Sequence, residues 1–215
     1  MINQRRYLIV FIIFLALGLG IGGYYFIKLN SKSDQNQTPL PITYREFRGP
    51  EGFIAQYPNW STLDIVILNR FIQTIMPKEL TNRNKILVAV ADGLGGQVVI
   101  SRRQLIKEEM NQPFGNLIKD VQTKESQALL NAGAIQEFRV LEESYQEKEV
   151  LIKSESIDGR GVGYINISKS FLVETQLLGI NNKYIYTLTF SAPTNTIAKY
   201  SQIINDIYQS VKKEK

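Results

Sequence analysis

The chain has 215 residues, of which 44% are hydrophobic, and a formal net charge of +5 at pH 7. It contains no Cys and no His, which excludes disulfides, Cys-His or Ser-His-Asp catalysis and the usual zinc sites. Residues 1–34 carry +3 of the net charge. The remaining +2 is too small and too dispersed for nucleic-acid binding, so we expect no nucleic-acid partner.

Residues 7–27 form a long apolar run without a charge, YLIVFIIFLALGLGIGGYYFI. As a helix these 21 residues span about 31 Å, close to the hydrocarbon thickness of a bilayer. Tyr24 and Tyr25 stand near one end, where aromatic rings prefer the membrane interface. A cleaved signal peptide is the alternative, but its apolar core is shorter and ends in a small-residue cleavage site. We therefore expect a transmembrane signal-anchor at residues 7–27.

The orientation of this anchor rests on its flanks. Arg5 and Arg6 precede the apolar run and Lys28 and Lys32 follow it, so the positive-inside rule is nearly balanced. A short polar head before a long apolar run is the usual signal-anchor layout. It favours a cytoplasmic head at residues 1–6 and a domain outside the cytoplasm.

Gly18 and Gly22 form a G-x-x-x-G pair within the anchor. Such a pair can form a helix dimerisation face. Glycine is also common in membrane helices, and we favour this simpler interpretation.

Residues 28–43 are polar, with Pro39 and Pro41 near the end, and show no apolar period. This composition is typical of a flexible tether. The remaining residues, 44–215, are long enough for one domain with its own core.

The first half of the domain predicts three strands. Gly52–Tyr57 alternates and ends at Pro58, and Lys85–Ala91 is apolar enough for burial on both faces. The glycine-rich segment Asp92–Gly96 leads into a returning strand, Gln97–Ser101. We interpret it as a hairpin turn rather than a phosphate loop, because it lacks a G-K-[ST] sequence and no helix follows it.

The second half predicts a helix, four strands and a closing helix. The first helix is Phe114–Ala132, followed by Gly133 as a C-cap. The four strands are Gln136–Ser144, Glu149–Ile157, Gly163–Glu174 and Lys183–Phe190, with turns at Asp158–Gly161 and Asn181-Asn182. The closing helix is Asn195–Lys212, capped by Thr194 or Asn195, with its apolar face at Ile197, Tyr200, Ile203, Ile204, Ile207 and Val211.

Consecutive strands without intervening helices indicate an antiparallel sheet. The two helices are too far apart in the chain to be crossovers of a parallel sheet. The fold class is therefore α+β, with helices packed on the sheet.

Three strings resemble a known family. They are Gly52–Trp60 (GFIAQYPNW), Asp158–Arg160 followed by Gly163-Tyr164, and Asn182–Pro193 (NKYIYTLTFSAP) before the closing helix. With the order of elements, they make residues 44–213 similar to the PsbP-like superfamily. This family includes the extrinsic oxygen-evolving protein P of photosystem II, its bacterial relatives and the DcrB-type periplasmic lipoproteins.

The resemblance implies an α/β/α sandwich around a central antiparallel sheet, and a role in binding or assembly rather than catalysis. The chain departs from the family in two respects. It has an apolar N-terminal run in place of a lipid-modified Cys, and it lacks the ion-binding His residues of some photosynthetic members.

Several side chains have both a functional and a structural interpretation, and the structural one is favoured for each. Trp60 suits a stacking platform or a core plug after Pro58. Asp92 and Asp158 suit a cation site or turn formation. Arg102 and Arg103 suit an anionic partner or a charged strand end.

The acidic stretch Glu142, Glu143, Glu147 and Glu149 suits a carboxylate pair for glycoside hydrolysis or a solvated hairpin tip. The hairpin tip is favoured here. Three glycosylation sequons begin at Asn36, Asn59 and Asn166 and carry no conclusion, because such triplets are frequent by chance.

The sequence thus predicts a non-catalytic, membrane-tethered binding or complex-assembly module of PsbP-like type, with a single-pass anchor and its domain outside the cytoplasm. No catalytic, cofactor-binding or metal-binding residue is assigned, and no cofactor is expected. The expected partners are the lipid bilayer, through residues 7–27, and a protein. Two alternatives remain open: a carboxylate-based hydrolase of the envelope, and a homo-oligomeric surface component assembled through Gly18 and Gly22.

Overall fold

The computed structural model describes residues 42–76, 78, 83–177 and 180–213. The head and anchor predicted at residues 1–27, and the tether up to residue 41, lie outside these ranges. Within them, no helix combines the length and the apolar character needed to cross a membrane.

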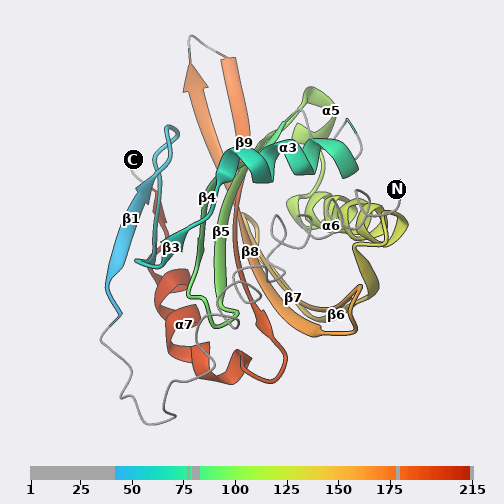
Figure 1. Ribbon diagram of the computed structural model, residues 1–215. Helices are drawn as coiled ribbons and strands as arrows, with labels where there is room; N and C mark the ends of the chain where they lie inside the picture. Colours follow the sequence, from blue (N-terminus) through green and yellow to red (C-terminus); the bar gives the residue numbers. More distant parts are fainter. Residues whose placement is uncertain (1–41, 77, 79–82, 178–179, 214–215) are drawn as a thin grey trace.

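A seven-stranded sheet forms the centre of the fold, and every neighbouring pair in it is antiparallel (Figure 1). Across the sheet the strands are β3 (Ser61–Thr62), β4 (Asn84–Ala91), β5 (Gln97–Gln104), β9 (Ile180–Pro193), β8 (Gly163–Leu177), β7 (Glu149–Asp158) and β6 (Ile135–Tyr145). The α+β class with an antiparallel sheet, predicted from the sequence, is confirmed.

A second, three-stranded antiparallel sheet lies beside the first. It consists of β1 (Tyr44–Arg48), β2 (Phe53–Pro58) and the short C-terminal β10 (Lys212–Lys213), in the order β1-β2-β10. The sequence predicts β2 but neither of its partners. β10 pairs with the start of β2, so the two ends of the domain close on one another.

The helices divide between two sides of the large sheet. α3 (Ile65–Ile75) and α6 (Phe114–Asn131) lie on one side, near the short α5 (Lys107–Met110). On the other side, α7 (Ser201–Gln209), preceded by a 3-10 turn at Ile197–Tyr200, packs with β2 (Figure 1). Both faces of the central strands are therefore covered.

The larger hydrophobic cluster lies on the α7 side of the sheet. Its most deeply buried members come from β2, β4, β5, β9 and α7: Phe53, Ala55, Val90, Val98, Ile100, Tyr186, Leu188, Phe190, Ala192 and Ile207. The side facing α3 and α6 has two smaller clusters. A stretch of polar sheet lies on that side, and it forms the candidate site described below.

Three predictions about local structure are wrong. Asn181 and Asn182 do not form a turn; they belong to β9, where they pair with Gln176 and Thr175 of β8. The closing helix is shorter than predicted, because α7 ends at Gln209 and Lys212 belongs to β10.

The predicted helix cap is also wrong. No side-chain cap bond is made at the start of the 3-10 turn, where Thr196 occupies the cap position, or at the start of α7. The Thr196 hydroxyl donates instead to the carbonyl of Pro193 at 3.1 Å. Together with the Thr196 N–H, which donates to the same carbonyl at 2.9 Å, this bond closes the turn that leads from β9 into the helix.

Helix α3 is absent from the sequence prediction, although a local signal exists for it. Asp64 caps its N-terminus, since one carboxylate oxygen accepts from the backbone N–H groups of Val66 (2.9 Å) and Ile67 (3.1 Å). Leu68, Phe71 and Ile72 follow at helical spacing and are buried against the sheet. Val66 and Ile67 stay exposed, which makes the apolar period harder to recognise in the sequence.

Candidate functional site

Strand alternation gives the large sheet a hydroxyl-rich patch on the side that faces α6. Successive residues of a strand point to opposite faces, so every second residue shares a face. On β5, β7, β8 and β9 these positions hold small polar side chains: Ser101, Ser154, Ser156, Asn166, Ser168, Ser170, Thr187 and Thr189. The opposite face of β8 and β9 carries Phe171, Val173, Tyr186, Leu188 and Phe190.

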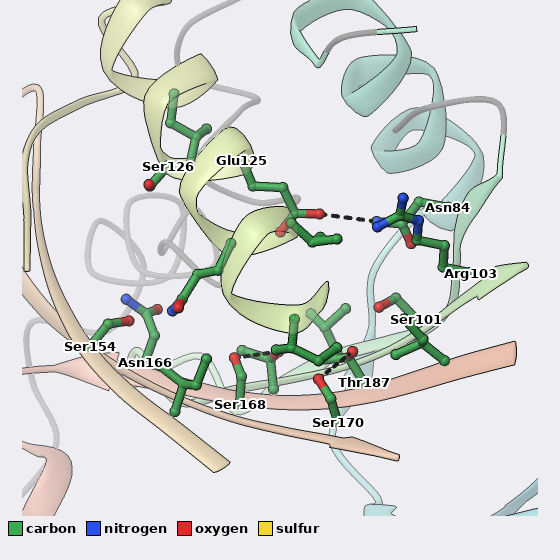
Figure 2. Close-up of a pocket in the computed structure, with 18 of the residues that line it drawn as sticks. Asn84, Ser101, Arg103, Glu125, Ser126, Ser154, Asn166, Ser168, Ser170 and Thr187 are labelled. Atoms are coloured by element: carbon green, nitrogen blue, oxygen red, sulfur yellow. Dashed lines mark hydrogen bonds between the residues drawn. The ribbon is translucent and has the colours of Figure 1, made fainter. Parts of the chain in front are cut away.

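A pocket of about 170 Å³ lies between this patch and α6. Figure 2 shows α6 above the strands, with Ser154, Asn166, Ser168, Ser170 and Thr187 along the sheet beneath it. Apolar side chains complete the walls: Ile118, Val121 and Leu129 from α6, and Ile135, Phe138, Ile152 and Ile185 from the sheet. The pocket is therefore polar on its floor and apolar on much of its walls.

Pairs of side chains hold the floor in place. Ser168 and Thr189 share a hydrogen bond of 3.0 Å, and Ser170 and Thr187 share one of 2.9 Å. Asn166 donates to the Ser156 hydroxyl at 3.1 Å. Each pair joins neighbouring strands, so the hydroxyl groups are fixed by cross-strand contacts.

Arg103 on β5 supplies a positive charge at one end of the pocket. The residue is 5% exposed, and its Nη2 donates to Glu109 Oε1 at 2.5 Å. Within the described part of the chain, its Nε and Nη1 have no hydrogen-bond partner. Burial lowers the pKa of the guanidinium, and Glu109 opposes this shift. Burying these two nitrogens without hydrogen-bond partners costs folding free energy, because they have lost the hydrogen bonds that water would provide.

Glu109 is shared between two arginines. Its Oε2 accepts from Arg83 at 2.7 Å and its Oε1 from Arg103. The backbone N–H of Ile106 also donates to Oε2, at 3.1 Å, at the start of α5. The carboxylate of Glu109 is thus fully engaged and holds one side of the Arg103 guanidinium in place.

Glu125 reaches into the same end of the pocket from α6. Its Oε1 accepts from the Asn84 side-chain amide at 3.3 Å, as Figure 2 shows. Burial raises the pKa of this carboxyl to about 7, although Arg103 and Asn84 act in the opposite direction. Near neutral pH the group therefore exchanges between a neutral acid and a carboxylate, which is a common property of functional sites.

The sequence singled out Arg102 and Arg103 together, and the structure separates them. Adjacent residues of β5 point to opposite faces. Arg102 forms an ion pair with Glu51, and its guanidinium lies 4.4 Å from the centre of the Tyr184 ring. Arg103 alone lines the pocket.

Asp92 and Asp158 both form turns, as the favoured interpretation predicts. Asp92 accepts from the backbone N–H groups of Leu94 (2.7 Å) and Gly96 (2.9 Å). Asp158, which is 1% exposed, accepts from the backbone N–H groups of Arg160 (2.8 Å) and Val162 (2.9 Å). These oxygens are occupied by the chain itself.

Trp60 is partly buried and packs edge-on against Phe190 and Tyr200, with ring centres 6.3 and 6.1 Å away. It belongs to the larger hydrophobic cluster, on the side of the sheet away from the pocket. The favoured interpretation of Trp60 as a core residue agrees with this position.

The acidic stretch lies around the β6–β7 turn. Glu142 and Glu147 are exposed, Glu143 accepts from the Tyr145 hydroxyl at 2.6 Å, and Glu149 pairs with Lys169 at 2.9 Å. Over the described residues, no group of three or more acidic side chains is arranged to hold a metal ion. The position of these residues therefore agrees with the favoured interpretation of a solvated hairpin tip.

Sequence reasoning missed Glu125, Asn84 and the hydroxyl patch. A signal for the patch was present, because Ser and Thr recur at every second position of three neighbouring strands. Each strand alone resembles an ordinary strand with one polar face, which is why the pattern went unrecognised. Only the strand order brings these faces together, and α6 then covers them.

No known protein family matches the chain, and no curated protein has a matching sequence. Among solved structures, the chain is similar to the solution structure of cyanobacterial PsbP from Synechocystis sp. PCC 6803. The sequence identity is 10% and the TM-score is 0.49, over 85% of this chain and 98% of the cyanobacterial one. A similarity of this size assigns no function to the chain.

Proposed function

We propose that this protein is a non-catalytic binding module, tethered to a membrane by residues 7–27, whose domain accepts a small molecule in the pocket between α6 and the sheet. The observation that carries the proposal is the pocket itself. It combines a fixed polar floor, apolar walls and one buried cation, which is the usual composition of a small-molecule site.

The contents of the pocket favour binding over hydrolysis. Carboxylate-based hydrolysis of a glycoside needs two carboxyl groups on either side of the scissile bond, about 5 to 9.5 Å apart. Among the described residues that line the pocket, Glu125 is the one carboxylate. The neighbouring Glu109 is held by Arg83 and Arg103.

The family and the place of action are part of the proposal. The three strings at Gly52–Trp60, Asp158–Tyr164 and Asn182–Pro193 support membership of the PsbP-like superfamily. The length and apolar character of residues 7–27 support a single-pass anchor in the cell membrane, with the domain outside the cytoplasm. A reporter enzyme that works only outside the cytoplasm, fused after Lys215, should be active; a well-expressed but inactive fusion would refute this orientation.

A release experiment tests the binding role. The full chain is purified from its own membranes in mild detergent and denatured, and the released small molecules are identified by mass spectrometry. We expect one compound in near-stoichiometric amount. Filling the pocket with Val121→Phe should abolish its release, whereas Gln127→Phe on the exposed side of α6 should release the wild-type amount.

Two results would overturn the binding role. One is equal release from the Val121→Phe chain, and the other is steady consumption of the compound by the intact protein. Should Val121→Phe fail to fold, Gln122→Phe introduces the same ring from the neighbouring position of the pocket wall. Cross-linking in intact membranes separately tests the expected protein partner.

A further inference from the structure

Charged side chains gather at the end of the pocket where Arg103 lies. Among the described residues, the charged groups around this end are Arg83 and Arg103 from the β4–β5 region, Glu109 from α5, and Asp120 and Glu125 from α6. Asp120 is exposed and forms an i,i+4 pair with Lys124, which largely cancels it. Glu109 accepts from both Arg83 and Arg103.

Two donor nitrogens of Arg103 are unmatched at this end of the pocket. Its Nη2 is taken by Glu109, while its Nε and Nη1 have no partner among the described residues. Guanidinium groups pair most favourably with carboxylates, which accept charge-assisted hydrogen bonds at about 2.7 to 2.9 Å. An anionic oxygen beside Arg103 would supply the acceptor that these nitrogens lack.

We infer that the pocket binds a small organic carboxylate, with its anionic head beside Arg103 and its body between α6 and the hydroxyl-rich floor. This inference rests on the proposed function, since it names the class of ligand for the same pocket. Ile118, Val121 and Ile185 contact the apolar part of such a ligand, and Ser168, Ser170 and Thr187 suit a polar substituent on it.

The size of the pocket limits the ligand. A cavity of about 150 Å³ is large enough for benzene, which has six non-hydrogen atoms. A pocket of about 170 Å³ therefore suits a carboxylate of roughly six to eight non-hydrogen atoms.

Glu125 makes the binding of an anion depend on pH. As a carboxylate, it places a negative charge at the end where the ligand head would bind; as a neutral acid, it removes this repulsion. With a pKa of about 7, the protonated fraction falls about tenfold between pH 6 and pH 8. The apparent affinity for a carboxylate should fall by the same factor, because only the protonated form is competent.

Three probes with five-carbon chains and different head groups test the charge of the ligand. The full chain in detergent micelles is titrated with pentanoate, pentanamide and pentylamine, and binding is followed by isothermal titration calorimetry at pH 6 and pH 8. We expect saturable binding of pentanoate at one site, at least tenfold weaker binding of pentanamide, and weaker binding still of pentylamine. Pentanoate should bind about tenfold less tightly at pH 8 than at pH 6.

Two variants assign the effect to residues. Glu125→Gln keeps the shape and the oxygen that accepts from Asn84 but cannot ionise, so pentanoate affinity should become equal at the two pH values. Arg103→Lys keeps the charge but loses the planar set of donors, and it should weaken pentanoate at least tenfold. Gln127→Phe, on the exposed side of α6, should bind as the wild type does.

The outcomes separate this inference from the proposed function. Tighter binding of pentylamine or equal binding of pentanamide, when abolished by Val121→Phe, leaves a binding pocket but refutes a carboxylate ligand. Failure of pentanoate to bind at both pH values also refutes it, and the release experiment then decides independently whether the pocket holds another compound. A pH dependence that persists in Glu125→Gln refutes the role of Glu125.

Discussion

The carboxyl group of Glu125 on α6 and the side-chain amide of Asn84 on β4 are joined by a hydrogen bond of 3.3 Å across one end of the pocket. The bond favours the charged form of Glu125, yet burial dominates and holds its pKa at about 7 against an ordinary value of 4.5. The folded protein therefore keeps a proton on Glu125 at pH values where the unfolded chain has lost it.

Because the folded protein retains this proton, we expect its free energy of unfolding to depend on pH. Between about pH 4.5 and pH 7 the folded state binds more protons than the unfolded state, so this contribution to stability falls as pH rises. The loss amounts to at most about 3 kcal/mol, since the side chain is only partly buried. Urea unfolding of the full chain at pH 5 and pH 8 should show a smaller difference for Glu125→Gln than for the wild type. Glu142→Gln, an exposed change of equal charge, is the control, and equal differences for all three chains would contradict the prediction.

A second prediction about stability concerns Asn69 in α3, the helix that the sequence analysis did not predict. Its side-chain nitrogen donates to the carbonyls of Ile65 (2.8 Å) and Ile86 (3.0 Å), and its oxygen accepts from the Ile86 N–H at 2.8 Å. These bonds satisfy the backbone of β4 beside the irregularity between Ile86 and Val88.

Asn69→Ala removes all three bonds and should destabilise the protein by about 2 to 3 kcal/mol, because the partly buried backbone groups of Ile86 lose their partner. Gln73→Ala, on the exposed side of the same helix, should change stability by less than about 0.5 kcal/mol. Thermal unfolding of both variants checks this, and similar midpoints would show that Asn69 contributes nothing special.

Asp92 and Tyr200 give a third prediction, which concerns the turn considered as a cation site. The Tyr200 hydroxyl donates to Asp92 Oδ2 at 2.5 Å, while Asp92 Oδ1 accepts from the backbone of Leu94 and Gly96. Tyr200→Phe removes one bond and should cost about 1 to 2 kcal/mol; Asp92→Ala removes three and should cost more. Calcium added to the wild type should leave its melting temperature unchanged, and a clear rise would instead favour the cation interpretation.

The larger part of the fold follows from sequence patterns that are local. The runs at 85–91, 97–101, 136–144, 149–157 and 163–174 predict β4 to β8, and the 3.6-residue period at 114–132 predicts α6. The strands that the sequence does not predict depend on pairing partners distant in the chain. β1 and β10 are strands because they pair with β2, and nothing in a five-residue or two-residue segment encodes such pairing.

The candidate site is predictable only in part, for a related reason. Arg103 was identified as a residue that could meet an anion, but its charged neighbour Arg102 looked equivalent in the sequence. The two differ because β5 alternates, and because α5 brings Glu109 to one face while Glu51 reaches the other. The shifted pKa of Glu125 depends on burial, which follows from the packing of α6 on the sheet.

Gly49 carries the last prediction, which tests how the small sheet docks on the large one. The Phe53 ring of β2 stacks on the Tyr186 ring of β9, with centres 4.3 Å apart and planes 6° from parallel, and the Tyr186 hydroxyl bonds to Glu51. A methyl group at the buried Gly49 would lie 2.8 Å from Tyr186 Cζ, so the tyrosine would have to move.

Gly49→Ala should therefore destabilise the protein by about 1 to 3 kcal/mol through overpacking. Gly159→Ala is the matched control, because its added methyl group meets only the Gly133 carbonyl, at an ordinary 3.6 Å. Denaturant unfolding of the two full-length variants should separate them clearly, with Gly159→Ala close to the wild type. Equal stability of the two would mean that the Phe53–Tyr186 stack yields without cost, and that the small sheet is less firmly docked than the ring geometry indicates.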